Sequence, residues 1–356
     1  MSWLLLLCAL GLPAGLLLMR RIPLCRPASL AKAVPFSIII PARNEERNIA
    51  PLLDSIARSS LQPDEVIVVD DGSTDRTAQM ARSHGARVIA SDDLPRGWTG
   101  KTWACHQGAL AAATGTFLFL DADTRLETEG LERMVAEYRA GGDVDAAFSV
   151  LPYHQTQKPY EELSLFFNLL MAMGAGGFES FGKPFLFGQS LLIAGETYQR
   201  SGGHRAVREH ILENFALASH VYSAGSKCVT RGGRGAIHIR MFPESFAQLR
   251  EGWTKAFADG ASASPRLVLA ISVYWLTAAI ATFLMLFSVH SGYLYPTLLY
   301  AGFVLQLFFL SRQIGNYRLT TCLFYPVPLM FYFAVFGESF YRRIFRRTVV
   351  WRGREI

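Results

Sequence analysis

Charged residues are scarce in this sequence of 356 residues. Asp, Glu, Lys and Arg make up 18% of the chain, whereas apolar residues make up 51%. These proportions exclude an ordinary, purely soluble domain, so membrane segments have to be considered first. The net charge of +6 could suggest nucleic-acid binding, but much of the positive charge lies at one end. The last fifteen residues contain six arginines, namely Arg342, Arg343, Arg346, Arg347, Arg352 and Arg354. A basic cluster directly after an apolar segment is typical of a cytoplasmic tail that faces anionic lipid, so we expect a membrane partner and no nucleic-acid partner.

Cysteine is also scarce, and its pattern excludes a disulfide framework. The five cysteines are scattered along the chain, and none forms a C-x-x-C pair that would suggest structural zinc. We expect all five to be reduced packing residues in a non-oxidising compartment. They are Cys8, Cys25, Cys105, Cys228 and Cys322.

Positive charge is missing before the first apolar run, where a secretory signal would carry it. Residues 3–19 are apolar and are interrupted only by Gly11, Pro13 and Gly15, while Arg20 and Arg21 come afterwards. This run is just long enough to span a membrane. The positive-inside rule then places the following residues in the cytoplasm. The alternative is an interfacial or cleaved segment.

Three further apolar segments lie near the C-terminus, at 266–289, 292–310 and 319–340. If all three crossed the membrane together with the N-terminal run, the arginine-rich tail would lie outside, against the positive-inside rule. We therefore expect the third segment, which contains Pro326 and Pro328, to be re-entrant or interfacial. The short apolar stretch at 162–177 is expected to be a helix in the membrane interface, with a core helix as the alternative.

The region 34–240 has the pattern of an α/β domain. Strand-like apolar runs at 36–40, 65–69, 86–90, 117–120 and 145–151 alternate with helical periodicity at 48–59, 74–84 and 100–113. This alternation predicts a parallel sheet that binds its ligand at the carboxyl ends of the strands.

Acidic residues follow two of these strands. Asp121 and Asp123 flank one alanine after the run 117–120, and their hard oxygen atoms suit Mg²⁺ or Mn²⁺ carrying a diphosphate. Asp70 and Asp71 follow the run 65–69, where a carboxylate can accept a hydrogen bond from a ribose hydroxyl or a uracil N–H. Each pair taken alone is also compatible with an ordinary turn.

Further polar residues are expected at the same edge of the sheet. Pro41, Arg43 and Glu45 follow the first strand, which makes a nucleotide crevice more plausible than several unrelated turns. Lys101 lies near a helix N-terminus, where its charge and the helix dipole can act together on a diphosphate. The glycine spacing of a Walker A loop is absent, and a solvated surface lysine is the alternative for Lys101.

Transfer to a hydroxyl group also needs a base that removes its proton. The downstream residues able to do so are His204, Glu209, His210, Glu213 and His238, and an ordinary glutamate on a helix surface is the alternative for Glu213. His238 could instead be a third metal ligand, although a buried core histidine is the alternative.

These motifs together resemble the family 2 glycosyltransferases of the GT-A fold. The resemblance rests on the segments 37–45, 69–75 and 120–123. The segment 97–108 and the terminal residues 351–354 are similar to two membrane groups within the family, the staphyloxanthin-type carotenoid glycosyltransferases and the hopanoid-associated glycosyltransferases. The segments 213–217 and 245–255 are similar to the carotenoid group in particular.

The resemblance implies roles for individual residues. Glu45, Asp71 and Lys101 would bind the UDP moiety, while Asp121 and Asp123 would hold the metal bound to the diphosphate. Many family members have Glu-Asp where this chain has Glu213 and Asn214, and that aspartate is usually regarded as the base. Because asparagine cannot serve as a base, the role falls to Glu213.

A second departure from the family concerns polymer synthesis. The Gln-x-x-Arg-Trp motif of processive members is missing, and Trp253 instead follows Glu251 and Gly252. We expect Trp253 on the acceptor side of a reaction that transfers a single sugar.

The expected function is an inverting, metal-dependent transfer of glucose from UDP-glucose to a lipid acceptor, a carotenoid acid. The alternatives are transfer to a hopanoid, a ceramide or a polyprenyl phosphate, or a catalytically silent membrane scaffold. We expect a multi-pass protein of the bacterial inner membrane with a cytoplasmic catalytic domain. The expected divisions are an N-terminal helix and basic linker (1–33), a GT-A domain (34–240), an interfacial segment (241–265), transmembrane helices (266–341) and a basic tail (342–356).

Overall fold

The chain forms two structural units in a computed structural model. One, the sheet unit, comprises Pro23–His154 and Gly182–Arg240, and the other, the helical unit, comprises Met1–Ile22, Gln155–Phe181 and Met241–Ile356. The segment at 155–175, expected within the catalytic domain, therefore groups with the apolar helices. The structure describes residues 3–27, 35–140, 145–175, 184–210, 212–260, 265–287, 293–345, 350–351 and 354–355.

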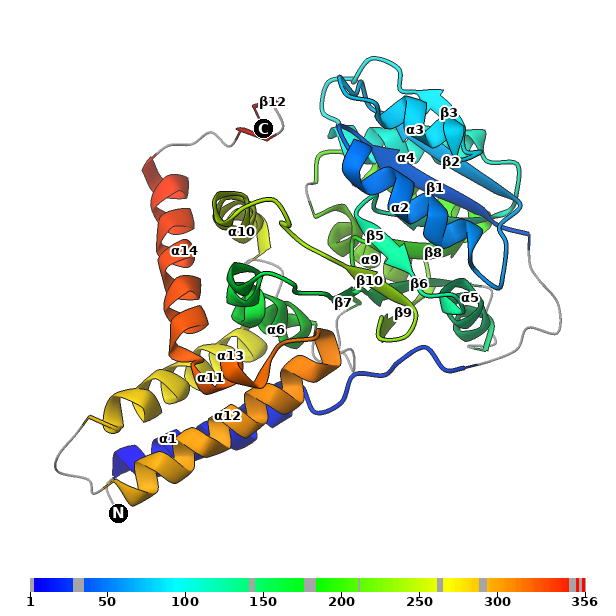
Figure 1. The fold of residues 1–356 in the computed structure, drawn as a ribbon. Coiled ribbons are helices and arrows are strands. Elements are labelled where there is room, and N and C mark those ends of the chain that lie inside the picture. Colours follow the sequence, from blue (N-terminus) through cyan, green and yellow to red (C-terminus); the bar gives the residue numbers. More distant parts are fainter. Residues whose placement is uncertain are drawn as a thin grey trace. The chain divides into compact units, whose positions relative to one another are not determined.

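The sheet unit is built on a seven-stranded sheet with the order β3-β2-β1-β4-β8-β6-β9 (Figure 1). Six of these described strands run in the same direction, but β8 is antiparallel to both β4 and β6. The strands expected from the sequence are parallel to one another, as predicted, whereas the antiparallel β8 lies in a segment where no strand was expected and makes the sheet mixed. The strands are β1 (Ser37–Ala42), β2 (Glu65–Asp70), β3 (Arg87–Ala90), β4 (Thr116–Leu120), β6 (Ala146–Leu151), β8 (Ser190–Ala194) and β9 (Lys227–Gly232).

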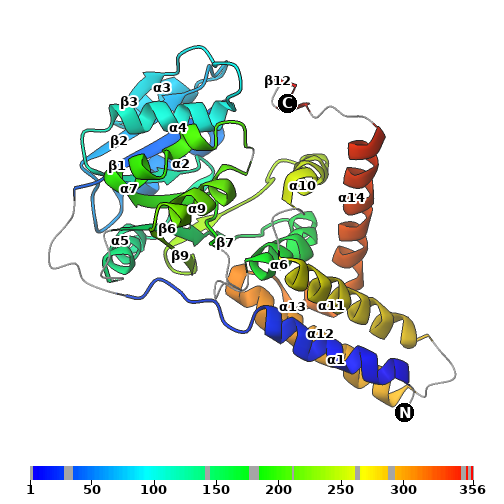
Figure 2. The same cartoon turned by 180° about the vertical axis from the view of Figure 1, so that it is seen from behind.

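Helices cover both faces of this sheet. On the face seen in Figure 1, α2 (Glu46–Ala57), α3 (Thr77–Ser83) and α5 (Gly130–Ala140) pack over a core that includes Leu192 of β8. On the face seen in Figure 2, α4 (Gly100–Ala111), α7 (Gly195–Arg200) and α9 (Glu213–Ser223) lie over a second core that includes Leu191 and Ile193. The short helix α8 (Gly203–Ala206) follows α7. Successive side chains of β8 thus alternate between the two faces.

A small second sheet follows the end of β4. It has the order β5-β10-β7, formed by β5 (Thr124–Leu126), β10 (Ile237–Ile239) and β7 (Tyr153–His154). Since β5 begins directly after Asp123, this sheet fixes the chain just beyond the two predicted metal ligands.

Three apolar helices pack together in the helical unit: α1 (Trp3–Leu18), α11 (Arg266–Met285) and α12 (Leu294–Ile314). The glycines of α1 permit a close approach, because a Cβ atom at Gly11 would lie 2.4 Å from Ala278 Cβ and one at Gly15 would lie 2.5 Å from Trp275 Nε1. Among the described residues, α11 and α12 are long and apolar enough to cross a membrane, whereas α1 is shorter, with 16 residues.

The expected single segment at 319–340 is broken into two helices, α13 (Leu319–Leu323) and α14 (Pro326–Phe345). Pro326 has no N–H group to continue the preceding helix, but it fits the first position of a new one. The expected helix at 162–177 is observed as a 3₁₀ turn, η1 (Pro159–Ser164), followed by α6 (Leu165–Gly174), while 176–177 lie outside the described residues. Helix α10 (Phe246–Gly260) and a short pairing of β11 (Val350–Trp351) with β12 (Arg354–Glu355) complete this unit. Residues 346–349, 352–353 and 356 of the basic tail lie outside the described residues.

Candidate functional site

One edge of the large sheet gathers most of the predicted site residues. The carboxyl ends of β1, β2 and β4 meet there, and the antiparallel β8 brings its amino end to the same edge. The backbone N–H of Asp121 donates to the carbonyl of Gln189 over 3.1 Å, which extends the pairing of β4 with β8 by one residue. The chain on both sides of this pair is therefore held in a fixed register.

Lys101 lies at the centre of this edge and is bound by two carboxylates. Its Nζ atom is 2.7 Å from Asp121 Oδ1 and 2.8 Å from Glu213 Oε1, and it also donates to the carbonyl of Gly188 over 3.1 Å. The first turn of α4 places Lys101 here, because the side chain of Thr99 caps the helix by accepting from the backbone N–H of Thr102. Desolvation opposes its charge, but the attraction of Asp121 and Glu213 outweighs it and holds the pKa of Lys101 well above its usual range. Lys101 is thus paired with two carboxylates, although 34% of its side chain is exposed.

Glu213, the first residue of α9, is almost completely buried, with 3% of its surface exposed. Burial raises the pKa of Glu213 above its usual value, and Lys101 opposes part of this rise. A carboxylate with a raised pKa accepts a proton more readily near neutral pH, as a general base requires. The role of Glu213 as a base stays a prediction.

The negative charges around Asp123 indicate whether a divalent cation fits at this edge of the sheet. Burial of this residue and the negative charges of Asp121 and Glu45 raise the pKa of Asp123 to about 7. A cation between these oxygen atoms would relieve the repulsion, and carboxylates are ligands that Mg²⁺ and Mn²⁺ prefer. The donor set therefore fits such an ion, with Asp121 and Asp123 as the residues that would hold it.

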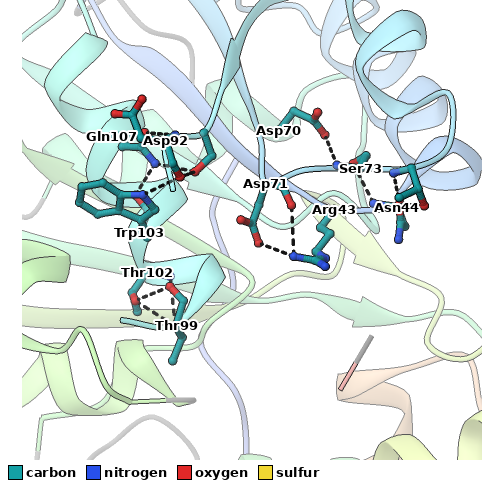
Figure 3. A network of polar contacts seen from close by, with 12 residues as sticks. Arg43, Asn44, Asp70, Asp71, Ser73, Asp92, Thr99, Thr102, Trp103 and Gln107 are labelled. Atoms are coloured by element: carbon teal, nitrogen blue, oxygen red, sulfur yellow. Dashed lines mark hydrogen bonds and ion pairs between the residues drawn. The ribbon is translucent and has the colours of Figure 1, made fainter. Parts of the chain in front are cut away.

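The ends of β1 and β2 form a second polar group, in which Figure 3 shows the Arg43 side chain directed at Asp71. Arg43 Nη1 lies 3.4 Å from Asp71 Oδ2 and donates to the backbone carbonyl of Asp71 over 3.3 Å. Asp70 accepts from the backbone N–H of Ser73, so one of its carboxylate oxygens stabilises the turn, as the turn interpretation anticipated. Asp71 is 8% exposed, and its carboxylate lies beside the Arg43 guanidinium at the sheet edge.

Two more predicted residues shape the end of β1. Pro41 pairs with Val69 of β2 but lies beyond the last residue of β1 that pairs with β4, so its missing N–H breaks no ladder bond there. Glu45 precedes α2 and accepts from the side chain of Asn48 over 2.7 Å. The negative charge of Glu45 contributes to the raised pKa of Asp123.

His238 does not join the two aspartates in a ligand group. It lies in β10, with Nδ1 3.2 Å from Glu127 Oε1. Burial lowers the pKa of His238, although Glu127 opposes this shift. Among the described residues, no three Asp, Glu, His or Cys side chains are grouped closely enough to hold a metal. We therefore do not retain His238 as a ligand.

The other residues considered as a base lie elsewhere. His204 is buried and its Nδ1 lies 2.9 Å from the Tyr198 hydroxyl. Glu209 and His210 are exposed. Trp253 belongs to the helical unit, where its Nε1–H donates to Ser164 over 3.0 Å and its ring stacks on Phe167 at 4.5 Å. Within the described part of the sheet unit, no hydrogen bond or ion pair joins His204, Glu209 or His210 to Lys101.

Two residues at this edge were not identified from the sequence, and a third, Asn214, was considered there only as a residue that cannot act as a base. Gly188 binds Lys101 through its carbonyl, which no sequence pattern reveals. Gln189 pairs with Asp121 through its backbone, and no motif marks the segment that contains it. The amide of Asn214 donates to the carbonyl of Phe187 over 2.9 Å, so this side chain supports the backbone next to Gly188.

Comparison with known proteins identifies relatives over most of the chain. A family model described as glycosyl transferase family 2 matches residues 37–215. The 4,4'-diaponeurosporenoate glycosyltransferase of Staphylococcus aureus strain USA300 is 35% identical over 333 residues, which cover 90% of this chain and 87% of the relative. The protein of the same name from strain MRSA252 is 36% identical over 330 residues, again covering 90% and 87%.

A solved structure has a similar fold. The mannosyltransferase of Pyrobaculum calidifontis, determined in complex with GDP-Man and Mn²⁺, superimposes with a TM-score of 0.55 at 18% identity and covers 95% of this chain and 98% of its own. This likeness supports the predicted GT-A fold. At this level of identity it carries no conclusion about substrate.

Proposed function

The chain belongs to glycosyl transferase family 2, as its motifs predicted, and on that premise we propose that it transfers glucose from UDP-glucose to a lipid. The acceptor in this proposal is a carotenoid acid of the diaponeurosporenoate class. The similarity to the staphylococcal enzymes, which covers 90% of the chain, supports a carotenoid acid as the acceptor. The observation that carries the chemistry is Lys101 held between Asp121 and the buried Glu213 at one sheet edge.

The donor would lie along this edge in an order set by the sheet. Asp71 and Arg43, at the ends of β2 and β1, would bind the nucleoside, with Glu45 and Asp70 beside them. The diphosphate would lie next to β4, where Lys101 supplies positive charge and Asp121 and Asp123 hold Mg²⁺ or Mn²⁺. An ion held by Asp121 and Asp123 would supply positive charge opposite the departing diphosphate.

The reaction in this proposal is a single displacement. An oxygen of the acceptor forms a bond to the anomeric carbon of glucose, and the bond to UDP breaks with its electron pair leaving on the diphosphate. Attack from the face opposite the leaving group inverts the configuration at that carbon. With a hydroxyl acceptor, Glu213 takes the proton; an acceptor that is already a carboxylate has no proton to lose.

In this proposal Trp253 keeps the acceptor-side position expected from the sequence. It is 5% exposed and its ring packs within the helical unit on Phe167 at 4.5 Å and on Phe242 at 5.7 Å, so it would support that unit and would not contact the lipid itself. In the same proposal, the protein is a multi-pass protein of the bacterial inner membrane, with the sheet unit in the cytoplasm.

The experiment incubates the purified, detergent-solubilised protein with UDP-glucose, Mn²⁺ and one lipid acceptor at a time. A carotenoid acid, a hopanoid, a ceramide and a polyprenyl phosphate are compared by chromatography and mass spectrometry of the lipid product. We expect a glucosyl ester of the carotenoid acid, with the β configuration when the α-linked donor is used. Preferred glucosylation of another lipid would refute the acceptor, and a complete lack of UDP release with or without Mn²⁺ would indicate a silent scaffold.

A further inference from the structure

Gln189 occupies a position at the site edge that the proposed roles do not use. It precedes β8, and its backbone carbonyl accepts from the N–H of Asp121 over 3.1 Å. The neighbouring Gly188 lies against the charged pair, since a Cβ atom there would be 3.5 Å from Glu213 Oε1 and 3.8 Å from Lys101 Nζ. The chain at 188–189 therefore lies beside the groups assigned to the chemistry.

The side chain of Gln189 is directed to the same face as these groups. Leu191 and Ile193 of β8 pack with the core under α4 and α9, whereas Leu192 packs on the opposite face. The bond to Asp121 sets Gln189 directly opposite Asp121 across the β4–β8 pair. Cross-strand neighbours lie on one face, so Gln189 is placed on the side on which Asp121 meets Lys101. This is the side from which α4 and α9 supply Lys101 and Glu213.

The side-chain oxygen of Gln189 is buried and has no hydrogen-bond partner among the described residues. Such an oxygen is costly to bury because it has lost water and gained no donor in return. A carbonyl oxygen can only accept, so the missing partner has to be a donor. Phosphate and carboxylate oxygens that carry no proton are therefore excluded as its ligand.

The strand order indicates which part of the substrate lies here. β8 is on the far side of β4 from β1 and β2, to whose ends we assigned the nucleoside. A donor that extends from β2 past the aspartates of β4 would bring its sugar next to β8. The hydroxyl groups of that sugar are the donors that remain.

We propose that Gln189 accepts a hydrogen bond from a hydroxyl of the transferred sugar and thereby contributes to the choice of donor sugar. This inference rests on the proposed function, because it needs a nucleotide sugar at this edge. It adds a specificity-determining residue that acts on the sugar and not on the nucleotide.

The test combines substitution of the protein with removal of single hydroxyls from the donor. Wild type, Gln189→Leu and Gln189→Met are compared with UDP-glucose and its 2-, 3-, 4- and 6-deoxy analogues. Both kcat/KM and equilibrium binding by calorimetry are measured in the presence of Mn²⁺. Gln62→Leu is the matched control, because Gln62 binds carbonyls at the end of α2 and lies before β2, at the opposite end of the strands from the site.

The expected result is a coupling between Gln189 and one hydroxyl. In the wild type, one deoxy donor should lose about 5- to 150-fold in kcat/KM, the range for a buried hydrogen-bond partner left unpaired. Gln189→Leu should lose a similar factor with UDP-glucose and show no further loss with that deoxy donor. Affinity for UDP itself and all values for Gln62→Leu should match those of the wild type.

Three results would overturn the assignment. If both variants show the same order of kcat/KM for the five donors as the wild type does, Gln189 accepts no hydrogen bond from a sugar hydroxyl. If both variants lose affinity for UDP, the residue serves the nucleotide or the fold. If the wild type neither binds nor uses UDP-glucose, the proposed function fails first and the assignment fails with it, which separates that case from the other two.

Discussion

The substitution Glu213→Gln tests the assigned base most directly. Glutamine has nearly the same shape as glutamate and keeps an oxygen that can accept from Lys101 at the 2.8 Å separation seen for Glu213. Lys101 also retains Asp121 at 2.7 Å. The change therefore removes a proton acceptor and leaves most of the surrounding contacts in place.

The expected loss depends on the acceptor. General-base catalysis contributes about 10²- to 10⁴-fold in rate, so turnover with a hydroxyl acceptor should fall by a factor in that range. With a carboxylate acceptor the loss should be much smaller, because no proton has to be removed. Stability should change little, because burial already disfavours the charged form of Glu213 and raises its pKa.

The assay is single-turnover sugar transfer at saturating UDP-glucose, together with the dissociation constant of UDP-glucose. Glu209→Gln is the control, because Glu209 is exposed and its nearest recorded ion pair is with Arg208 at 3.8 Å. The reasoning is refuted if Glu213→Gln weakens UDP-glucose binding while the bound complex turns over at the wild-type rate. Glu213 would then belong to the donor site.

Four further results are expected. Asp123→Ala should abolish Mn²⁺-dependent transfer while leaving the thermal midpoint unchanged or raised, because burial and the charges of Asp121 and Glu45 raise the pKa of Asp123 to about 7 and so already disfavour its carboxylate. Full activity in that variant or in excess chelator would contradict the metal assignment. Asn214→Asp restores the family pattern and, on sequence grounds, should increase transfer to hydroxyl acceptors. It should also lower the free energy of unfolding by about 1–3 kcal/mol, because a carboxylate would replace the amide that donates to the Phe187 carbonyl. A variant as stable as the wild type in denaturant titration would argue against this. Burial lowers the pKa of His204 to about 3, so as pH falls this imidazole is protonated in the unfolded chain before it is protonated in the folded one. The free energy of unfolding should therefore decrease below about pH 6.5, by up to about 1.4 kcal/mol per pH unit. His204→Gln should reduce this slope between pH 7 and pH 5, and an unchanged slope would count against the reasoning. In sealed cells, the cysteine introduced by Trp351→Cys should not be labelled by an impermeant thiol reagent, because the arginine-rich tail is expected in the cytoplasm. Labelling of this cysteine would favour four full membrane crossings.

The sequence alone was sufficient for the main secondary structure and for part of the site. Apolar runs and helical periodicity located β1, β2, β3 and β4 and the helices between them to within a few residues. Because parallel strands present their carboxyl ends at one edge, the sequence also indicated that Asp71 and Asp121 share that edge. These are consequences of local pattern and of a general property of α/β sheets.

Only the tertiary structure decided the contacts that join distant segments. The direction of β8 depends on the path of the whole chain, and it brings Gly188 and Gln189 to the site. The Lys101–Glu213 pair requires α4 and α9 to cover the same face of the sheet, which no local pattern specifies. The role of Asn214 likewise depends on a backbone carbonyl, a group that every residue carries. The sequence specified which chemical groups are available, whereas the packing of non-local elements determined which of them meet.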